Sequence, residues 1–178
     1  REAGDMALQG RKSGPLTVTT KSSPIDVVTK FDKASEAMIT EGLAKVRPDD
    51  AIIGEEGASK QGTTGITWHI DPIDGTTNFY FDVPMWAVSI GAVDEHGPLA
   101  GAVYVPALGE MFSGARGEGS TLNGMPISVR ENNDIADALV CTGYSYQISE
   151  RAVHAKRVAE IVMKVRDIRR FGAAAIDL

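Results

Sequence analysis

DPIDGTTNF, at residues 71–79, is the stretch of this chain that decides the fold. It follows a β-like apolar run at 66–70, so the pattern predicts that Asp71 lies where a strand ends. Gly75 permits a left-handed backbone, and Thr76 opens a run of residues typical of a helix start. Two carboxylates and several unpaired backbone N–H groups should therefore meet at one point.

The carboxylates of Asp71 and Asp74 and the N–H groups beside them favour opposite ligands. Unpaired N–H groups at a helix start bind phosphate, whereas carboxylates repel it. Hard divalent cations such as Mg²⁺ resolve the conflict, because they prefer oxygen ligands and can lie between carboxylate and phosphate. A turn with an aspartate cap would explain the Asp-Gly pair alone, but the whole stretch favours a metal site.

Two further acid-bearing segments precede this stretch. GEEG at 54–57 follows another β-like run, so Glu55 also leaves a strand end. KSSPIDVVTKFD at 21–32 gives a loop and then Asp32, which falls in the first turn of an amphipathic helix predicted for 31–46. Taken alone, the first segment is a surface turn and the second contains a helix cap.

The composition is that of a folded globular protein. The 178 residues are 43% hydrophobic and 24% charged, with a net charge of −6, which excludes disordered, collagen-like and coiled-coil chains. The longest nearly unbroken apolar run, at 99–105, is far shorter than the roughly 20 residues that cross a bilayer, so we expect no membrane segment. Cys141 is the single cysteine and no leader-like stretch is visible, so we expect a cytoplasmic protein.

The periodicity divides the chain into two parts. We expect an N-terminal α+β domain at 1–135 and, at 136–178, the beginning of an incomplete α/β domain. The DEHGP break at 94–98 predicts a hairpin. The expected helices are 2–11, 31–46, 150–165 and one that starts at 173, and the expected strands are 51–53, 66–70, 85–93, 99–105, 110–115, 138–142 and 167–171.

Taken in order, the three acid-bearing segments resemble the inositol monophosphatase family of Mg²⁺-dependent, lithium-sensitive phosphatases. The family's markers are K-S-S-P-x-D-x-V-T-x-x-D, G-E-E and D-P-I-D-G-T-x-N-F, and all three are present here. RRFGAAA at 169–175 is similar to a later family segment, R-x-x-G-(S/T/A)-A-A. The resemblance implies a layered αβαβα sugar-phosphatase fold and hydrolysis of a small phosphate ester, with myo-inositol 1-phosphate as the first candidate.

The resemblance also implies the metal ligands. Glu55, Asp71 and the carbonyl oxygen of Ile73 would bind one Mg²⁺, and Asp71 would bridge to a second Mg²⁺ shared with Asp74. Two or three Mg²⁺ per site and inhibition by Li⁺ follow from the same resemblance. A homodimer is expected as well.

Catalytic and substrate-binding residues are implied in the same way. Thr76, hydrogen-bonded to Asp32, and Glu55 would position an attacking water, so no phosphoenzyme is needed. The N–H groups of Gly75 and Thr76 would hold phosphate oxygens. The hydroxyl pocket of the substrate would include Gly172, Ala173 and Ala174.

One family feature is missing from the sequence. The second metal of the family also takes an aspartate from a Trp-Asp motif further downstream, whereas Trp68 precedes His69 and Trp86 precedes Ala87 here. We therefore expect the second domain to be truncated. Asp177 is not expected to replace the missing ligand, because its family counterpart is a helix residue without that role.

Other functions stay open at this point. A 3′(2′),5′-bisphosphate nucleotidase, a fructose-1,6-bisphosphatase or a histidinol phosphatase would share the metal signature. A non-catalytic role as a binding partner would use the segment 151–170, which has seven bases and two acids. No aromatic residues alternate with these bases, which argues against nucleic acid as the partner. No phosphate-loop motif and no paired histidines are present.

Overall fold

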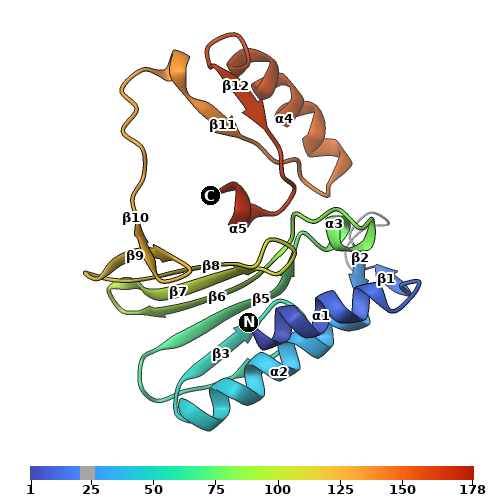
Figure 1. Cartoon of the computed structure of the whole chain (residues 1–178), viewed down its shortest axis with the longest axis vertical. Helices are drawn as coiled ribbons and strands as arrows, with labels where there is room; N and C mark the ends of the chain where they lie inside the picture. Colours follow the sequence, from blue (N-terminus) through green and yellow to red (C-terminus); the bar gives the residue numbers. More distant parts are fainter. Residues whose placement is uncertain (21–26) are drawn as a thin grey trace.

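The computed structural model describes residues 1–20 and 27–178 (Figure 1). Residues 21–26, which include the first half of the K-S-S-P marker, lie outside the described residues. The helices are α1 (Glu2–Lys12), α2 (Lys30–Val46), α3 (Thr76–Tyr80), α4 (Ile148–Ile161) and α5 (Ala174–Asp177), with the 3-10 turn η1 (Ile135–Asp137). In this described part of the chain, no helix has the length and apolar character needed to cross a bilayer.

Among residues 1–20 and 27–178, eight strands form one mixed sheet in the order β10-β9-β8-β7-β6-β5-β3-β4, and two strand pairs lie outside it. β5 is parallel to β3 and antiparallel to β6. The predicted hairpin at 94–98 is confirmed, since it joins β6 to β7. The strands are β1 (Val18–Thr20), β2 (Val27–Thr29), β3 (Ala51–Gly54), β4 (Ser59–Lys60), β5 (Thr67–Asp74), β6 (Ala87–Asp94), β7 (Gly97–Val105), β8 (Glu110–Ala115), β9 (Gly119–Leu122), β10 (Met125–Ile127), β11 (Leu139–Cys141) and β12 (Asp167–Arg169).

Helices α1 and α2 cover one face of this sheet, because their apolar residues are buried against it (Figure 1). Ile39 of α2 packs in one cluster with Ile52 of β3. A second cluster centres on the fully buried Phe79 of α3, whose ring makes edge-to-face contacts with Phe31 and Trp86. Such aromatic pairs are stabilising beyond the area that they bury. The second cluster therefore anchors the short helix that follows DPIDG.

β5 differs from its predicted extent. The sequence predicted that the strand ends just before Asp71, and this was wrong, because β5 continues to Asp74. Asp71 pairs with Ser89 and Asp74 pairs with Ala87, with a register shift between the two pairs. Pro72 has no N–H to donate, which accounts for an interruption of the ladder at this point. Both aspartates therefore extend from an irregular strand end rather than from a turn.

The C-terminal part consists of the parallel pair β11 and β12, helix α4, and α5, which lies between them and the large sheet (Figure 1). α4 ends at Ile161, before the predicted end at 165, since turns and bends follow at 162–166. The elements therefore lie in layers: α1 and α2, the large sheet, α5, the pair β11 and β12, and α4 (Figure 1). This arrangement confirms the predicted layered α/β fold class. The domain boundary near residue 135 stays a prediction.

Candidate functional site

The turn between β5 and α3 brings distant segments together at Gly75. The backbone of Gly75 has a φ of 87°, a conformation that other residues adopt only at a cost. A Cβ atom at this position would lie 2.9 Å from the Cβ of Ala173 and 3.3 Å from the carbonyl oxygen of Gly172. Glycine thus allows residues 172–173 to pack directly against the DPIDGT stretch.

Asp71 is a buried carboxyl group with one unpaired oxygen. Its Oδ1 atom is buried and has no hydrogen-bond partner. Burial, then repulsion from Glu55 and a side-chain hydrogen bond with it, and finally repulsion from Asp74 raise the pKa of Asp71 to about 8. A buried carboxylate next to other carboxylates demands either a proton or a cation.

Asp74 contacts the backbone of α5, about a hundred residues away in the sequence. Its Oδ1 accepts a hydrogen bond from the N–H of Ala174 at 3.1 Å, and its Oδ2 accepts one from Ala175 at 2.5 Å. Burial raises the pKa of Asp74, while these two N–H groups act in the opposite direction. The predicted metal ligand Asp74 is therefore also the contact that fixes α5 beside β5.

Asp32 and Thr76 meet as the resemblance implied. The Thr76 hydroxyl lies 3.1 Å from Oδ1 of Asp32 and 2.9 Å from the carbonyl oxygen of Ile73. The other carboxylate oxygen of Asp32 accepts bonds from the N–H and the hydroxyl of Thr29, in a capping box at the start of α2. Burial raises the pKa of Asp32, although these hydrogen bonds partly oppose the effect.

Glu55 lies in the turn that follows β3. Its N–H donates to the carbonyl oxygen of Ile70, the residue before Asp71, at 3.0 Å. Its carboxylate acts on both aspartates of β5, because repulsion from Glu55 contributes to the raised pKa of Asp71 and of Asp74. Three carboxylates thus share one electrostatic environment.

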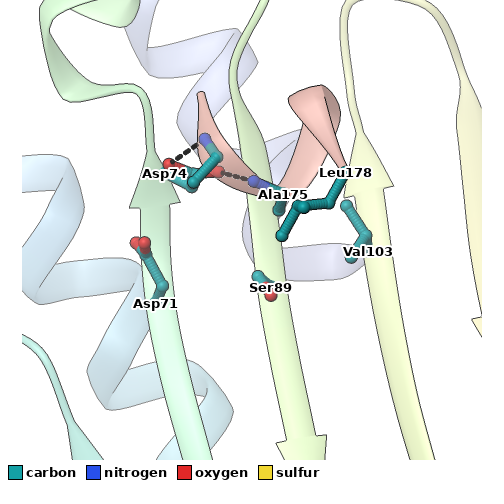
Figure 2. Close-up of a pocket in the computed structure, with 7 residues that line it drawn as sticks. Asp71, Asp74, Ser89, Val103, Ala175 and Leu178 are labelled. Carbon is teal, nitrogen blue, oxygen red and sulfur yellow. Dashed lines mark hydrogen bonds between the residues drawn. The ribbon is translucent and has the colours of Figure 1, made fainter. Parts of the chain in front are cut away.

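A cavity of about 490 Å³ opens beside these aspartates. Figure 2 shows Asp71 and Asp74 on β5, Ser89 on the adjacent strand β6, Val103 on the next strand β7, and Ala175 of α5 hydrogen-bonded to Asp74. The cavity is lined by Asp71, Asp74, Ser89, Val103, Ala174, Ala175 and Leu178. One end is acidic and the rest is largely apolar, which suits a phosphate bound through cations together with a compact organic group.

The structure brings most of the predicted site residues together. The Thr76 hydroxyl lies within hydrogen-bond distance of both Asp32 and the carbonyl oxygen of Ile73, and Gly172, Ala173 and Ala174 pack against Gly75 and Asp74. Within residues 1–20 and 27–178, however, no three Asp, Glu, His or Cys side chains stand in the arrangement of a formed metal site. The carboxylates are near enough to repel one another, and their roles as ligands stay a proposal.

Three residues that shape the site were not predicted from the sequence or were assigned another role. Asn78 was interpreted only as a helix-start residue, but its Nδ2 donates to the carbonyl oxygens of Met85 and Phe171, both at 2.6 Å. Ser35 and Glu36 of α2 were not singled out, although both are buried and contact the site. Their spacing from Asp32, on the same helix face, is the signal that could have identified them.

The model of the inositol monophosphatase family matches residues 1–178. The chain belongs to this family. The inositol-1-monophosphatase of Mycobacterium leprae is 37% identical over 175 residues, which cover 93% of this chain and 60% of that protein. A family member of Pasteurella multocida named Nus factor SuhB is 37% identical over 180 residues, covering 100% of this chain and 67% of that protein.

Solved structures of family members have the same fold. The extragenic suppressor protein SuhB of Bartonella henselae superposes with a TM-score of 0.92 at 30% identity, covering 99% of this chain and 68% of that one. An IMPase/NADP phosphatase complexed with Mg²⁺ and phosphate has a TM-score of 0.81 at 23% identity, covering 97% of this chain and 64% of that one. This chain therefore spans about 60% to 68% of the length of these family members.

Proposed function

We propose that this chain contains the metal and phosphate site of a Mg²⁺-dependent phosphatase that hydrolyses a small phosphate monoester. Membership of the inositol monophosphatase family supports phosphatase activity. The observation that supports the metal most directly is the buried Oδ1 of Asp71, which has no hydrogen-bond partner. A divalent cation would provide that partner and would relieve the repulsion among Asp71, Glu55 and Asp74.

The proposed ligands form two unequal groups. Glu55, Asp71 and the carbonyl oxygen of Ile73 would hold one Mg²⁺, while Asp71 and Asp74 would share a second. When bound, Mg²⁺ lowers the pKa of a coordinated water and neutralises phosphate charge. We include two or three Mg²⁺ per site in the proposal. We also include inhibition by Li⁺, because the group with fewer ligands, Asp71 and Asp74, binds its cation more weakly and can exchange it for another small, hard cation.

Asp32 and Thr76 would orient the attacking water, together with Glu55. The Thr76 hydroxyl has one proton and two acceptors within reach, Asp32 and the carbonyl oxygen of Ile73. If that carbonyl were a metal ligand, the hydroxyl would donate to Asp32, and its lone pairs would be available to accept a hydrogen bond from water. The raised pKa of Asp32 makes its carboxylate a suitable base behind Thr76.

The proposed substrate is myo-inositol 1-phosphate. The N–H groups of Gly75 and Thr76 would bind phosphate oxygens, because the first N–H groups of a helix have no acceptor within it. Residues 172–174 adjoin them and would contact the substrate hydroxyls. Bisphosphate nucleotides, fructose 1,6-bisphosphate and histidinol phosphate are the alternative substrates, since the metal site alone does not distinguish between phosphate esters.

A second candidate is a binding role that needs no catalysis. The relative named Nus factor SuhB and the exposed bases Arg151, Lys156 and Arg157 on α4 favour it. An acidic protein is the partner that these bases suit, because they are not interleaved with aromatic residues. The homodimer and the cytoplasmic location stay predictions.

Phosphate release tests the proposal. We expect turnover of myo-inositol 1-phosphate with Mg²⁺, none in excess EDTA, and a steep loss in D74N. E41Q is the matched control, because Glu41 is an exposed acid on α2 and its replacement should leave the rate unchanged. Turnover that survives EDTA, or full activity in D74N, would contradict the metal site. Partner binding that weakens with salt but ignores EDTA would instead support the second candidate.

A further inference from the structure

Three polar residues on one face of α2 are buried next to the candidate site. Asp32, Ser35 and Glu36 are spaced i, i+3 and i+4, so they lie on the same side of the helix. Their exposed fractions are 1%, 0% and 4%. Burying a polar group costs free energy unless the group is hydrogen-bonded. The hydrogen-bond partners of these three residues therefore show which segments this helix face holds in place.

Two of these residues form hydrogen bonds with the DPIDGT stretch. Asp32 accepts a hydrogen bond from the Thr76 hydroxyl at 3.1 Å. The Ser35 hydroxyl donates to the carbonyl oxygen of Pro72 at 3.1 Å, within the irregular part of β5 between its two aspartates. One helical turn therefore fixes both the strand end and the start of α3.

Glu36 holds the remaining segment, the turn that contains Glu55. Its Oε2 accepts from the N–H of Glu56 at 2.7 Å, and its Oε1 accepts from the N–H of Ala58 at 2.8 Å. The carboxylate fits so closely that a Cβ on Gly54 would lie 2.2 Å from Oε2. Both oxygens of one buried carboxylate are thus occupied by backbone N–H groups on either side of Gly57.

The same turn is tied to β5 from its other side. The N–H of Glu55 donates to the carbonyl oxygen of Ile70 in β5 at 3.0 Å. Within the turn, the N–H of Gly54 donates to the carbonyl oxygen of Ala58 at 2.7 Å. Glu36 is a buried acid on the helix that packs against this strand, and the mechanism proposed above does not use it. A carboxylate is suited to this task because hydrogen bonds to an ionised acceptor are stronger than neutral ones.

We propose that Glu36 is a positioning residue, which holds the Glu55 turn in register with Asp71 so that both carboxylates can bind one cation. The inference rests on the proposed function, because it concerns the metal affinity of that same site. α2 would then set the relative positions of all three acid-bearing segments, through Asp32, Ser35 and Glu36.

Calorimetric titration of the purified chain with Mg²⁺ alone tests this role without any turnover. We expect E36Q and E36D to bind Mg²⁺ about tenfold more weakly or worse, as is typical when a partner of a metal ligand is removed. E36D retains the charge but withdraws the carboxylate from the two N–H groups, whereas E36Q retains the shape. E41Q and E41D are the matched controls on the same helix and should bind like wild type.

A loss of stability alone must not be mistaken for positioning, so D50N is a further control. Asp50 is buried and accepts hydrogen bonds from Arg47, Thr64 and Trp68 at the opposite end of β3. We expect D50N to lower the melting temperature but to bind Mg²⁺ within about twofold of wild type. If Glu36 served stability alone, its variants would show this same combination.

The outcomes separate the two proposals. The positioning role would be overturned, and the metal site would stand, if E36D and E36Q both bound Mg²⁺ within twofold of wild type. The same conclusion would follow if E36D bound Mg²⁺ normally and only E36Q bound it more weakly. Wild type that binds no Mg²⁺, or E55Q that binds as tightly as wild type, would overturn the metal site itself and, with it, a role of Glu36 toward that metal.

Discussion

The region around α2, β5 and α3 and the region of β11, α4 and β12 lie on opposite sides of α5 and are built differently (Figure 1). In the first region, Phe79 is 0% exposed, and two clusters of buried side chains pack β5 against α1 and α2. In the second, α4 has no buried residue, and Ile148 and Met163 are 76% and 86% exposed. The two regions meet through the segment 171–178, which contacts Asn78 and Asp74.

This difference divides the site into two functions. The carboxylates that would bind metal belong to the well-packed region, where side chains are held in fixed geometry. The residues that would contact substrate hydroxyls belong to a segment held by few hydrogen bonds. Binding of the cation held by Glu55, Asp71 and Ile73 should therefore depend on the first region alone, whereas substrate affinity should depend on how firmly the second region is attached to it.

The largest effect is expected from removing the carboxylate shared by both proposed cations. D71N should lower phosphate release by more than about a hundredfold, since loss of a ligand exceeds the 10- to 100-fold effects typical of its outer partners. The same change should stabilise the metal-free chain, because it removes a buried, repelled carboxyl group. Kinetics in Mg²⁺ measure the first effect, and urea unfolding in EDTA measures the second. If neither the rate of phosphate release nor the free energy of unfolding changed, Asp71 would not be a metal ligand.

The difference in packing predicts unequal effects of truncation. F79A should lower the free energy of unfolding by about 3–5 kcal/mol, as for other buried aromatic residues. I148A on α4 should change it by no more than about 0.5 kcal/mol, as for other exposed positions. Urea unfolding of both variants checks this, and equal losses would show that the two regions are equally well packed.

Asn78 joins the two regions, and its removal should separate substrate binding from metal binding. N78A loses two hydrogen bonds, each contributing about 0.5–1.5 kcal/mol, so we expect KM to rise roughly tenfold. Mg²⁺ affinity should stay within about twofold of wild type. N133A, at an exposed loop position, is the matched control. A selective loss of Mg²⁺ affinity with normal KM would reverse the assignment of the two functions.

A further expected effect is a pH dependence of stability that originates in the first region. Asp71 has a pKa of about 8 when folded against 3.8 as the ordinary value, so the folded chain binds more protons between these pH values. In EDTA the contribution of Asp71 to stability should be complete below about pH 4 and lost as the pH rises through about 8. Thermal melts across this range should show the decline in wild type and a flatter profile in D71N.

The sequence predicted the local parts of the site better than their assembly. DPIDGT indicated two carboxylates beside a helix start because Asp, Gly and Thr have strong local preferences, and the structure places Asp71, Asp74 and Gly75 accordingly. The end of β5 was missed because a proline normally ends a strand pattern, whereas here pairing resumes at Asp74.

Long-range contacts account for the remaining omissions. Helical periodicity assigns a charged residue such as Glu36 to the solvent side, and only the Glu55 turn packed above α2 explains its burial. The contact of Asp74 with α5 joins segments about a hundred residues apart. The family resemblance indicated that residues 172–174 belong to the site, but no local pattern specifies which atoms they contact.

We expect Glu55, Asp71 and Ile73 to bind one divalent cation together. The most direct measurement is anomalous diffraction near the manganese edge from crystals of the chain soaked in Mn²⁺, which prefers the same oxygen ligands as Mg²⁺. We predict a peak within coordination distance of the Asp71 carboxylate, the Glu55 carboxylate and the Ile73 carbonyl oxygen, absent from D71N crystals. Strong peaks elsewhere with none at Asp71 would contradict the claim.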